Sequence, residues 1–176
     1  MATDREHVYV PTMARLLQVE QITDLEKLFT LELPEGNSLG SEPGQFVEVS
    51  LFGIGEAPIS ISSSPSRRNG TFELCVRRVV DVTNAMHQME PGALLGIRGP
   101  FGNPFPIAEM KGKDILFAAG GLGLAPLRSL INEVLDQRGL FGRVIILSGT
   151  KPPSEIHYGA ERAAWAARDA DEFHMS

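Results

Sequence analysis

The stretch D-I-L-F-A-A-G-G-L-G-L-A-P, residues 114–126, decides the fold of this chain. Its first six residues are mostly apolar, as expected for a strand that is buried on both faces of a sheet. Three glycines follow, and they allow the backbone to come close to another group. Beyond them, apolar residues recur at helical spacing: Leu124, Leu127, Leu130, Ile131, Val134 and Leu135. The stretch therefore predicts a strand, a glycine turn and the start of a helix.

The junction between turn and helix is a candidate anion site. Free backbone N–H groups and the positive end of the helix dipole converge there, and a dinucleotide pyrophosphate is a common ligand. The pattern departs from G-x-G-x-x-G, and Pro126 stands in the first helical turn, where proline is tolerated. A lone glycine turn also fits a tight connection between a core strand and a core helix, so both interpretations stay open.

Composition limits the classes of protein that the chain can belong to. Its 176 residues, 43% of them hydrophobic, suffice for one generous domain or two small ones. The single cysteine, Cys75, excludes internal disulfides and any iron–sulfur cluster held by four cysteines of this sequence. The four histidines lack metal-ligand spacing, so we expect no metal site, and the net charge of -6 argues against nucleic acid as a partner. Without a signal-peptide core or an apolar run near the ~20 residues of a membrane span, we expect a cytoplasmic protein.

The first part of the chain has the pattern of a small antiparallel barrel. Short apolar segments alternate with turns rich in glycine, proline and polar residues. We expect two strands within residues 14–33 that part at Thr23 and Asp24, then strands at 45–51, from 59, at 71–79 and at 94–98. A turn is expected at 53–58, and Thr83 is expected to cap a short helix that ends at Met89. The strand at 94–98 would close the barrel.

Beyond Lys111 the pattern changes to alternating strands and helices. The expected order is a strand at 114–119, a helix at 124–137, a strand at 143–147, a helix at 159–167 and a strand at 172–175. This β-α-β-α-β unit is half of a doubly wound parallel fold. We therefore predict an antiparallel barrel domain over residues 1–108 and a partial nucleotide-binding α/β domain over 109–176. We also expect that the chain is truncated at its C-terminal end.

Four segments in order resemble the motifs of the ferredoxin–NADP reductase family. They are A-P-I-S-I-S-S (57–63), C-V-R-R (75–78), V-T (82–83) and A-G-G-L-G-L-A-P (119–126). The nearest branch of the family looks like the electron-transfer subunits of multi-subunit enzymes, namely hydrogenase gamma subunits and the electron-transfer subunit of dihydroorotate dehydrogenase. The segments G-E-A-P-I-S and R-G-P-F-G-N-P-F-P look most like those of the hydrogenase gamma subunits. The resemblance extends from about residue 10 to residue 174. It implies a six-stranded FAD-binding barrel followed by an NAD(P)-binding half.

The first motif implies the residues that line the flavin ring. By this resemblance Ala57, Pro58, Ile59 and Ser60 bind FAD, and the Ser60 hydroxyl hydrogen-bonds flavin N5, the atom that accepts hydride. An ordinary serine at a strand start is the alternative. Ile59 replaces the aromatic residue that would stack on the ring, and Ala57 stands where most relatives have an arginine against the pyrophosphate.

The second and third motifs imply contacts along the next strand and helix. The resemblance assigns Leu74, Cys75, Val76, Arg77, Val82 and Thr83 to FAD binding. Arg77 or Arg78 could supply the charge that Ala57 lacks. The Thr83 hydroxyl could contact the pyrophosphate, a role that is compatible with a simple helix cap. Val80 stands where relatives usually have glycine, and we expect Cys75 to act as a small buried hydrophobe.

The fourth motif implies the nicotinamide-nucleotide site. The resemblance assigns Gly120, Gly121, Leu122, Gly123, Pro126, Gly149 and Lys151 to NAD(H) or NADP(H). Relatives commonly have an arginine near Lys151 that meets the ribose or its phosphate. Lysine keeps the charge but not the planar fork, which favours NAD, although a lysine beside a turn is often merely solvated.

The resemblance implies an FAD-containing electron-transfer subunit of a multi-subunit oxidoreductase. It would pass electrons between NAD(P)H and iron–sulfur carriers by hydride transfer to flavin N5. A [2Fe-2S] cluster is expected only in a missing C-terminal segment or on a partner subunit. The alternatives are a non-catalytic assembly or docking subunit that has lost nicotinamide binding, and a free-standing flavin reductase that reduces soluble acceptors.

Overall fold

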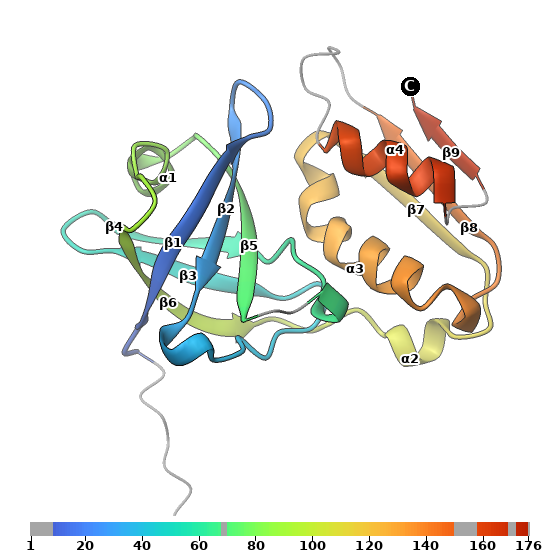
Figure 1. Cartoon of the computed structure of the whole chain (residues 1–176), viewed down its shortest axis with the longest axis horizontal. Coiled ribbons are helices and arrows are strands. Elements are labelled where there is room, and N and C mark those ends of the chain that lie inside the picture. The colour runs from blue at the N-terminus through green and yellow to red at the C-terminus, as the bar shows by residue number, and fades with distance from the viewer. Residues whose placement is uncertain (1–8, 68–69, 150–157, 169–171, 176) are drawn as a thin grey trace, which may run out of the picture.

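The computed structural model describes residues 9–67, 70–149, 158–168 and 172–175. An antiparallel barrel occupies one side of the molecule and a parallel sheet with its helices the other (Figure 1). The predicted fold class, an antiparallel barrel followed by a partial doubly wound unit, is therefore confirmed. The division into two domains at residue 108 stays a prediction.

The barrel is one six-stranded sheet in the order β4-β3-β6-β1-β2-β5, with antiparallel neighbours. Its strands are β1 (Thr12–Gln21), β2 (Glu26–Glu32), β3 (Phe46–Leu51), β4 (Gly55–Ser60), β5 (Thr71–Arg77) and β6 (Leu94–Phe101). A bridge between Ile61 and Leu74 brings the end of β4 against β5. Closure of the barrel therefore takes place directly after Ser60, and β6 lies between β1 and β3 instead of closing the barrel as expected.

Alternation along the strands builds the core of the barrel. In β3, for example, Val47, Val49 and Leu51 are buried while the residues between them are partly exposed. Because successive side chains of a strand point to opposite faces, one set fills the interior. Phe29 and Leu31 of β2 are fully buried in the same cluster.

The second part contains a parallel sheet in the order β7-β8-β9. Its elements are β7 (Ile115–Gly120), a 3-10 turn (Gly121–Gly123), α3 (Leu124–Asp136), β8 (Val144–Gly149), α4 (Gly159–Arg168) and β9 (Glu172–Met175). A short helix, α2 (Ile107–Met110), precedes the sheet. The predicted order of strands and helices is confirmed, with ends that shift by one or two residues.

The expectation that the first parallel strand is buried on both faces is wrong. Ile115 and Phe117 pack under α3, whereas Leu116 is 62% exposed. Leu147 of β8 is also exposed, at 37%. In the described part of the chain, helices cover one face of this sheet, so the strands alternate instead of being apolar throughout.

Two local expectations also need correction. Strand β4 begins at Gly55, inside the predicted turn, and Pro58 is accommodated because β4 is an edge strand. Helix α1 (Asp81–Met86) has Val80 as its N-cap, so Thr83 lies inside the first turn and not at the cap. The helix also ends before the expected Met89.

The two parts share an apolar contact. Leu28 of β2 and Cys75 of β5 are buried in the cluster that α3 forms with the parallel sheet. Polar bonds add to it, since Ser64 donates to Glu133 (2.8 Å) and Arg67 pairs with Asp136 (2.9 Å). In the described residues, no helix is long and apolar enough to span a bilayer.

Candidate functional site

A cavity of about 520 Å³ lies where the barrel meets the parallel unit. Its wall comes from β4, the end of β5, the loop before α1 and the first turn of α3. The lining residues are Ala57, Pro58, Ile59, Ser60, Cys75, Arg77, Val79, Val80, Thr83, Leu122, Gly123, Ala125 and Pro126. The wall is mostly apolar and has few polar groups, as is typical of cofactor sites.

Strand β4 supplies the first side of the wall. Its residues pair with β3 alone, so its other edge faces the cavity and the end of β5. Ser60 is half-buried, and its hydroxyl has no hydrogen-bond partner among the described residues. This hydroxyl is therefore available to a ligand.

Strand β5 supplies the second side, with alternate residues. Cys75 and Arg77 line the cavity, whereas Leu74 and Val76 point into the barrel core, with 0% and 1% of their surface exposed. The Arg77 Nε donates to the carboxylate of fully buried Glu26, and this ion pair fixes the guanidinium at the cavity wall. Arg78 does not line the cavity.

The Cys75 thiol is protonated at neutral pH. Burial raises its pKa to about 11. Since the thiolate is the nucleophile, this side chain is chemically inert near neutrality.

Thr83 holds the loop before α1 in place. Its hydroxyl donates to the Val80 carbonyl oxygen (3.0 Å) and accepts from the N–H groups of Val79 and Val80, both at 2.9 Å. A hydroxyl has one hydrogen to donate, so a contact from it to a phosphate would have to replace the bond to Val80. The expected capping and binding roles therefore compete in this conformation.

The glycine turn is open on its outer side. A Cβ placed on Gly120, Gly121 or Gly123 would meet no described atom within 4 Å. Gly121 has a φ of 51°, which favours glycine, but Gly123 has a helical φ of -59° that any residue adopts. The protein itself therefore gives no steric reason for glycine at position 123.

The cavity brings together most, though not all, of the predicted site residues. Ten line it: Ala57, Pro58, Ile59, Ser60, Cys75, Arg77, Thr83, Leu122, Gly123 and Pro126. Val82 is buried in the barrel core with Leu74 and Val76, and Gly120, Gly121 and Gly149 lie outside the lining. Lys151 lies outside the described residues. Val79, Val80 and Ala125 line the cavity without having been predicted to bind. Ala125 lies within the fourth motif, and Val79 and Val80 lie between the second motif and the third.

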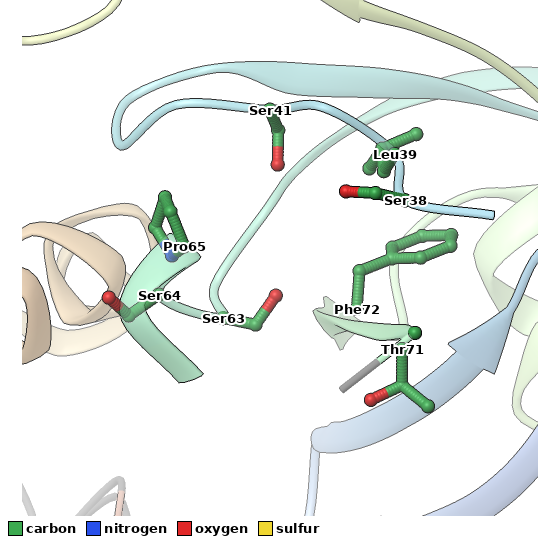
Figure 2. A pocket seen from close by; sticks show the side chains of 9 residues that line it. Ser38, Leu39, Ser41, Ser63, Ser64, Pro65, Thr71 and Phe72 are labelled. Atoms are coloured by element: carbon green, nitrogen blue, oxygen red, sulfur yellow. The ribbon is translucent and has the colours of Figure 1, made fainter. Parts of the chain in front are cut away.

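A second hollow lies between the loop at 38–41 and residues 63–72 (Figure 2). Ser38, Ser41 and Ser63 point toward its centre, whereas Ser64 and Thr71 point away. Its volume of about 10 Å³ holds about one water molecule. It is therefore too small for a nucleotide.

Residues 13–105 match the oxidoreductase FAD-binding domain family. The chain belongs to this family. The predicted resemblance to the flavin-binding ferredoxin–NADP reductase family is thereby confirmed.

Two kinds of curated relative are similar to this FAD-binding chain. Sulfhydrogenase 2 subunit gamma of Pyrococcus furiosus is 42% identical over 151 residues, which are 84% of this chain and 51% of the relative. A probable dihydroorotate dehydrogenase B (NAD(+)), electron transfer subunit, of Methanopyrus kandleri is 34% identical over 68% of this chain and 44% of the relative. The chain thus spans about half the length of the curated relatives that it matches.

Solved structures share the fold of this FAD-binding chain. A ferredoxin NADP+ reductase from Neisseria gonorrhoeae, with bound FAD and NADP, superposes with a TM-score of 0.77 at 22% identity. The superposition covers 93% of this chain and 67% of that one. The flavohem-like FAD/NAD binding domain of a nitric oxide dioxygenase from Vibrio cholerae gives a TM-score of 0.81 at 16% identity.

The cavity of the FAD-binding chain fits a flavin in its chemistry. Apolar side chains such as Ile59 and Val79 provide a surface for a planar ring, and Ser60 offers a hydrogen-bonding group. Arg77 is the cation of the wall and can meet a phosphate, a contact that Ala57 cannot make. Among the described residues there is no group of three histidine, cysteine or acidic side chains able to hold a metal ion.

Proposed function

We propose that the chain is the FAD-containing electron-transfer subunit of a multi-subunit oxidoreductase. Electrons would pass between NAD(P)H and iron–sulfur carriers. The observation that carries this proposal is the shared cavity, because β4 and the turn before α3 each contribute to one wall. Two nucleotides bound on these two elements would face each other.

Bound FAD would supply a ring that accepts a hydride at N5 and releases electrons singly. Ser60 would hold N5 through its free hydroxyl, and Ile59 would cover the ring by dispersion contact. Arg77, anchored by Glu26, would neutralise the pyrophosphate. The remaining FAD contacts at Leu74, Val76, Val82 and Thr83 would involve main-chain groups.

The nicotinamide nucleotide would bind on the glycine turn. Open space in front of Gly120, Gly121 and Gly123 permits close approach of a pyrophosphate to the backbone. Gly149 and Lys151 would meet the ribose, and the lysine favours NAD over NADP because it lacks a bidentate fork. Hydride transfer needs no protein acid or base, so the contribution of these residues is positioning.

The partners that we propose are iron–sulfur and catalytic subunits of a larger complex in the cytoplasm. The similar relatives are themselves a sulfhydrogenase subunit and a dihydroorotate dehydrogenase subunit, which supports this proposal. With one cysteine in the sequence, a four-cysteine [2Fe-2S] cluster would lie on a partner or on residues beyond this sequence.

Visible absorption tests the proposal. The purified chain, reconstituted with FAD, should show bound-flavin bands that bleach when NADH is added without oxygen. A colourless protein, or a yellow one that neither nicotinamide reduces, would refute it. Rapid turnover with artificial dyes by the isolated chain would instead indicate a free-standing flavin reductase.

The second candidate function is a non-catalytic docking subunit that has lost nicotinamide binding. Ala57 favours it, since this buried residue brings no charge to the cavity where most relatives have arginine. Flavin retention without a response to either nicotinamide is the result expected of this alternative.

A further inference from the structure

Arg128 connects the barrel to both helices of the parallel unit. It lies on α3, and its side chain is 11% exposed. Its Nη1 donates to the Ser62 carbonyl oxygen (3.1 Å) and to the Glu73 carboxylate (2.5 Å), while its Nε donates to Glu161 of α4 (2.5 Å). The guanidinium also lies over the Tyr158 ring, 4.8 Å from the centroid. One side chain therefore joins three segments that are far apart in sequence.

The barrel partners of Arg128 are close in sequence to residues of the cavity wall. Ser62 follows Ser60 by two residues, and its N–H donates to the Glu73 carbonyl oxygen (2.9 Å) where the barrel closes. On the other side, Arg128 follows Gly123 by five residues in the first turns of α3. Arg128 therefore links the end of the Ser60 strand directly to the helix that carries the glycine turn.

The charges around Arg128 favour its ionised form. Burial alone would lower the pKa of this guanidinium, but the carboxylates of Glu161 and Glu73 outweigh burial and raise it. The three hydrogen bonds use the planar fork of arginine, which a lysine cannot reproduce. The link is thus permanently charged and specific to arginine.

A second set of bonds ties the other end of α3 to the barrel. Arg67 makes two bonds of 2.9 Å to Asp136, and the Ser66 hydroxyl adds one of 2.6 Å. Arg67 is more exposed, at 48%, and its partner Asp136 lies two helical turns beyond Arg128 on α3. The Arg67 Nη1 also lies 3.4 Å from the Glu161 carboxylate that Arg128 binds. Arg67 provides the control, because it also joins the barrel to α3 but makes its two shortest bonds to Asp136, at the far end of that helix.

We infer that Arg128 is a positioning residue that sets the distance between the Ser60 edge of the barrel and the glycine turn. Its consequence for hydride transfer rests on the proposed function. Reacting atoms must approach to about 3–3.5 Å, and a displacement of about 1 Å can slow a reaction by roughly 100-fold. Loss of the three bonds would let α3 shift relative to Ser60, while the apolar contact holds the two parts together.

Hydrogen exchange of the ligand-free chain tests the link itself. Arg128→Gln should raise amide exchange in both 61–63 and 120–127, by roughly tenfold or more. Arg67→Gln should raise it only around 64–67 and the end of α3. Exchange in R128Q equal to that of the wild type at both segments would overturn the inference. If R128Q does not fold, Arg128→Lys is the test variant, and it should raise exchange in the same two segments to a smaller extent.

Stopped-flow reduction tests the consequence. With flavin bound, R128Q and R128K should lower the limiting rate constant at saturating NADH by roughly 10- to 100-fold per bound flavin, and R67Q should change it less than about twofold. A purely structural role would reduce flavin content or melting temperature and leave this rate constant unchanged, which would overturn the inference. If NADH does not reduce the wild type, the proposed function fails, and hydrogen exchange still decides the role of Arg128.

Discussion

Replacement of Ser60 by alanine should separate activity from stability. The Ser60 hydroxyl makes no hydrogen bond to the described part of the chain, so its loss breaks no bond within it. We expect the free energy of unfolding to change by less than about 0.5 kcal/mol, as for a surface substitution. A hydrogen bond to flavin N5 is worth about 0.5–1.5 kcal/mol, so its loss should lower the rate constant of flavin reduction by about 2- to 13-fold.

Anaerobic stopped-flow reduction and urea unfolding measure the two quantities on the same preparations. Ser60→Thr keeps the hydroxyl and should retain most of the rate. Ser63→Ala is the matched control, because the Ser63 hydroxyl accepts from the Glu73 N–H (3.0 Å) and its removal should cost about 1 kcal/mol of stability without slowing reduction. An S60A variant that is reduced as fast as the wild type would falsify the assignment of Ser60 to N5.

Three further predictions concern the rest of the cavity. Gly123→Ala should leave the melting temperature unchanged, and the control variant Gly139→Ala should do the same. Gly123→Ala should nevertheless weaken NADH binding by about 1–3 kcal/mol, because the added methyl group occupies the space of the ligand. Equal dissociation constants for NADH in the two variants would contradict this prediction. Glu26→Gln should lower the free energy of unfolding in urea by about 1–3 kcal/mol and weaken FAD binding, since Arg77 loses its buried partner. An unchanged dissociation constant for FAD would rule out the role of Glu26 in anchoring Arg77. The raised pKa of Cys75 means that the folded chain holds this proton more tightly, so the free energy of unfolding should fall as the pH rises from about 9 to about 11. Cys75→Ala should reduce this slope in urea titrations, and buried Tyr158, whose pKa is also raised, should account for a slope that remains above about pH 10.

The order of elements could be predicted from the sequence because local patterns determine it. Alternation in the strand at 45–51 and the helical spacing after the glycine turn each depend on neighbouring residues alone, and β3 and α3 formed within one residue of those bounds. Closure of the barrel could not be predicted in this way. It depends on the pairing of Ile61 with Leu74, and no residue pattern marks these two as partners.

The exposure of Leu116 also depends on tertiary structure. The run at 114–119 is apolar in both alternate sets, which is typical of a strand covered on both faces. Which face is covered depends on where α3 and α4 pack, and spacing within the strand contains no information about that. Likewise, the Arg128 link was not predicted, since its partners Ser62, Glu73 and Glu161 come together only in the folded chain.

The alternation of β5 explains why the family motif identified the correct strand but not which of its side chains face the cavity. Leu74 and Val76 fill the barrel core, and Cys75 and Arg77 face the cavity, because successive residues of a strand point to opposite faces. Cys75 also belongs to the core under α3, so this one strand contacts both cores and the cavity between them. A substitution at Leu74 or Val76 should therefore affect flavin binding only through barrel stability, whereas one at Arg77 acts on the ligand directly. The role of each residue in this motif therefore depends on the face of β5 on which its side chain lies.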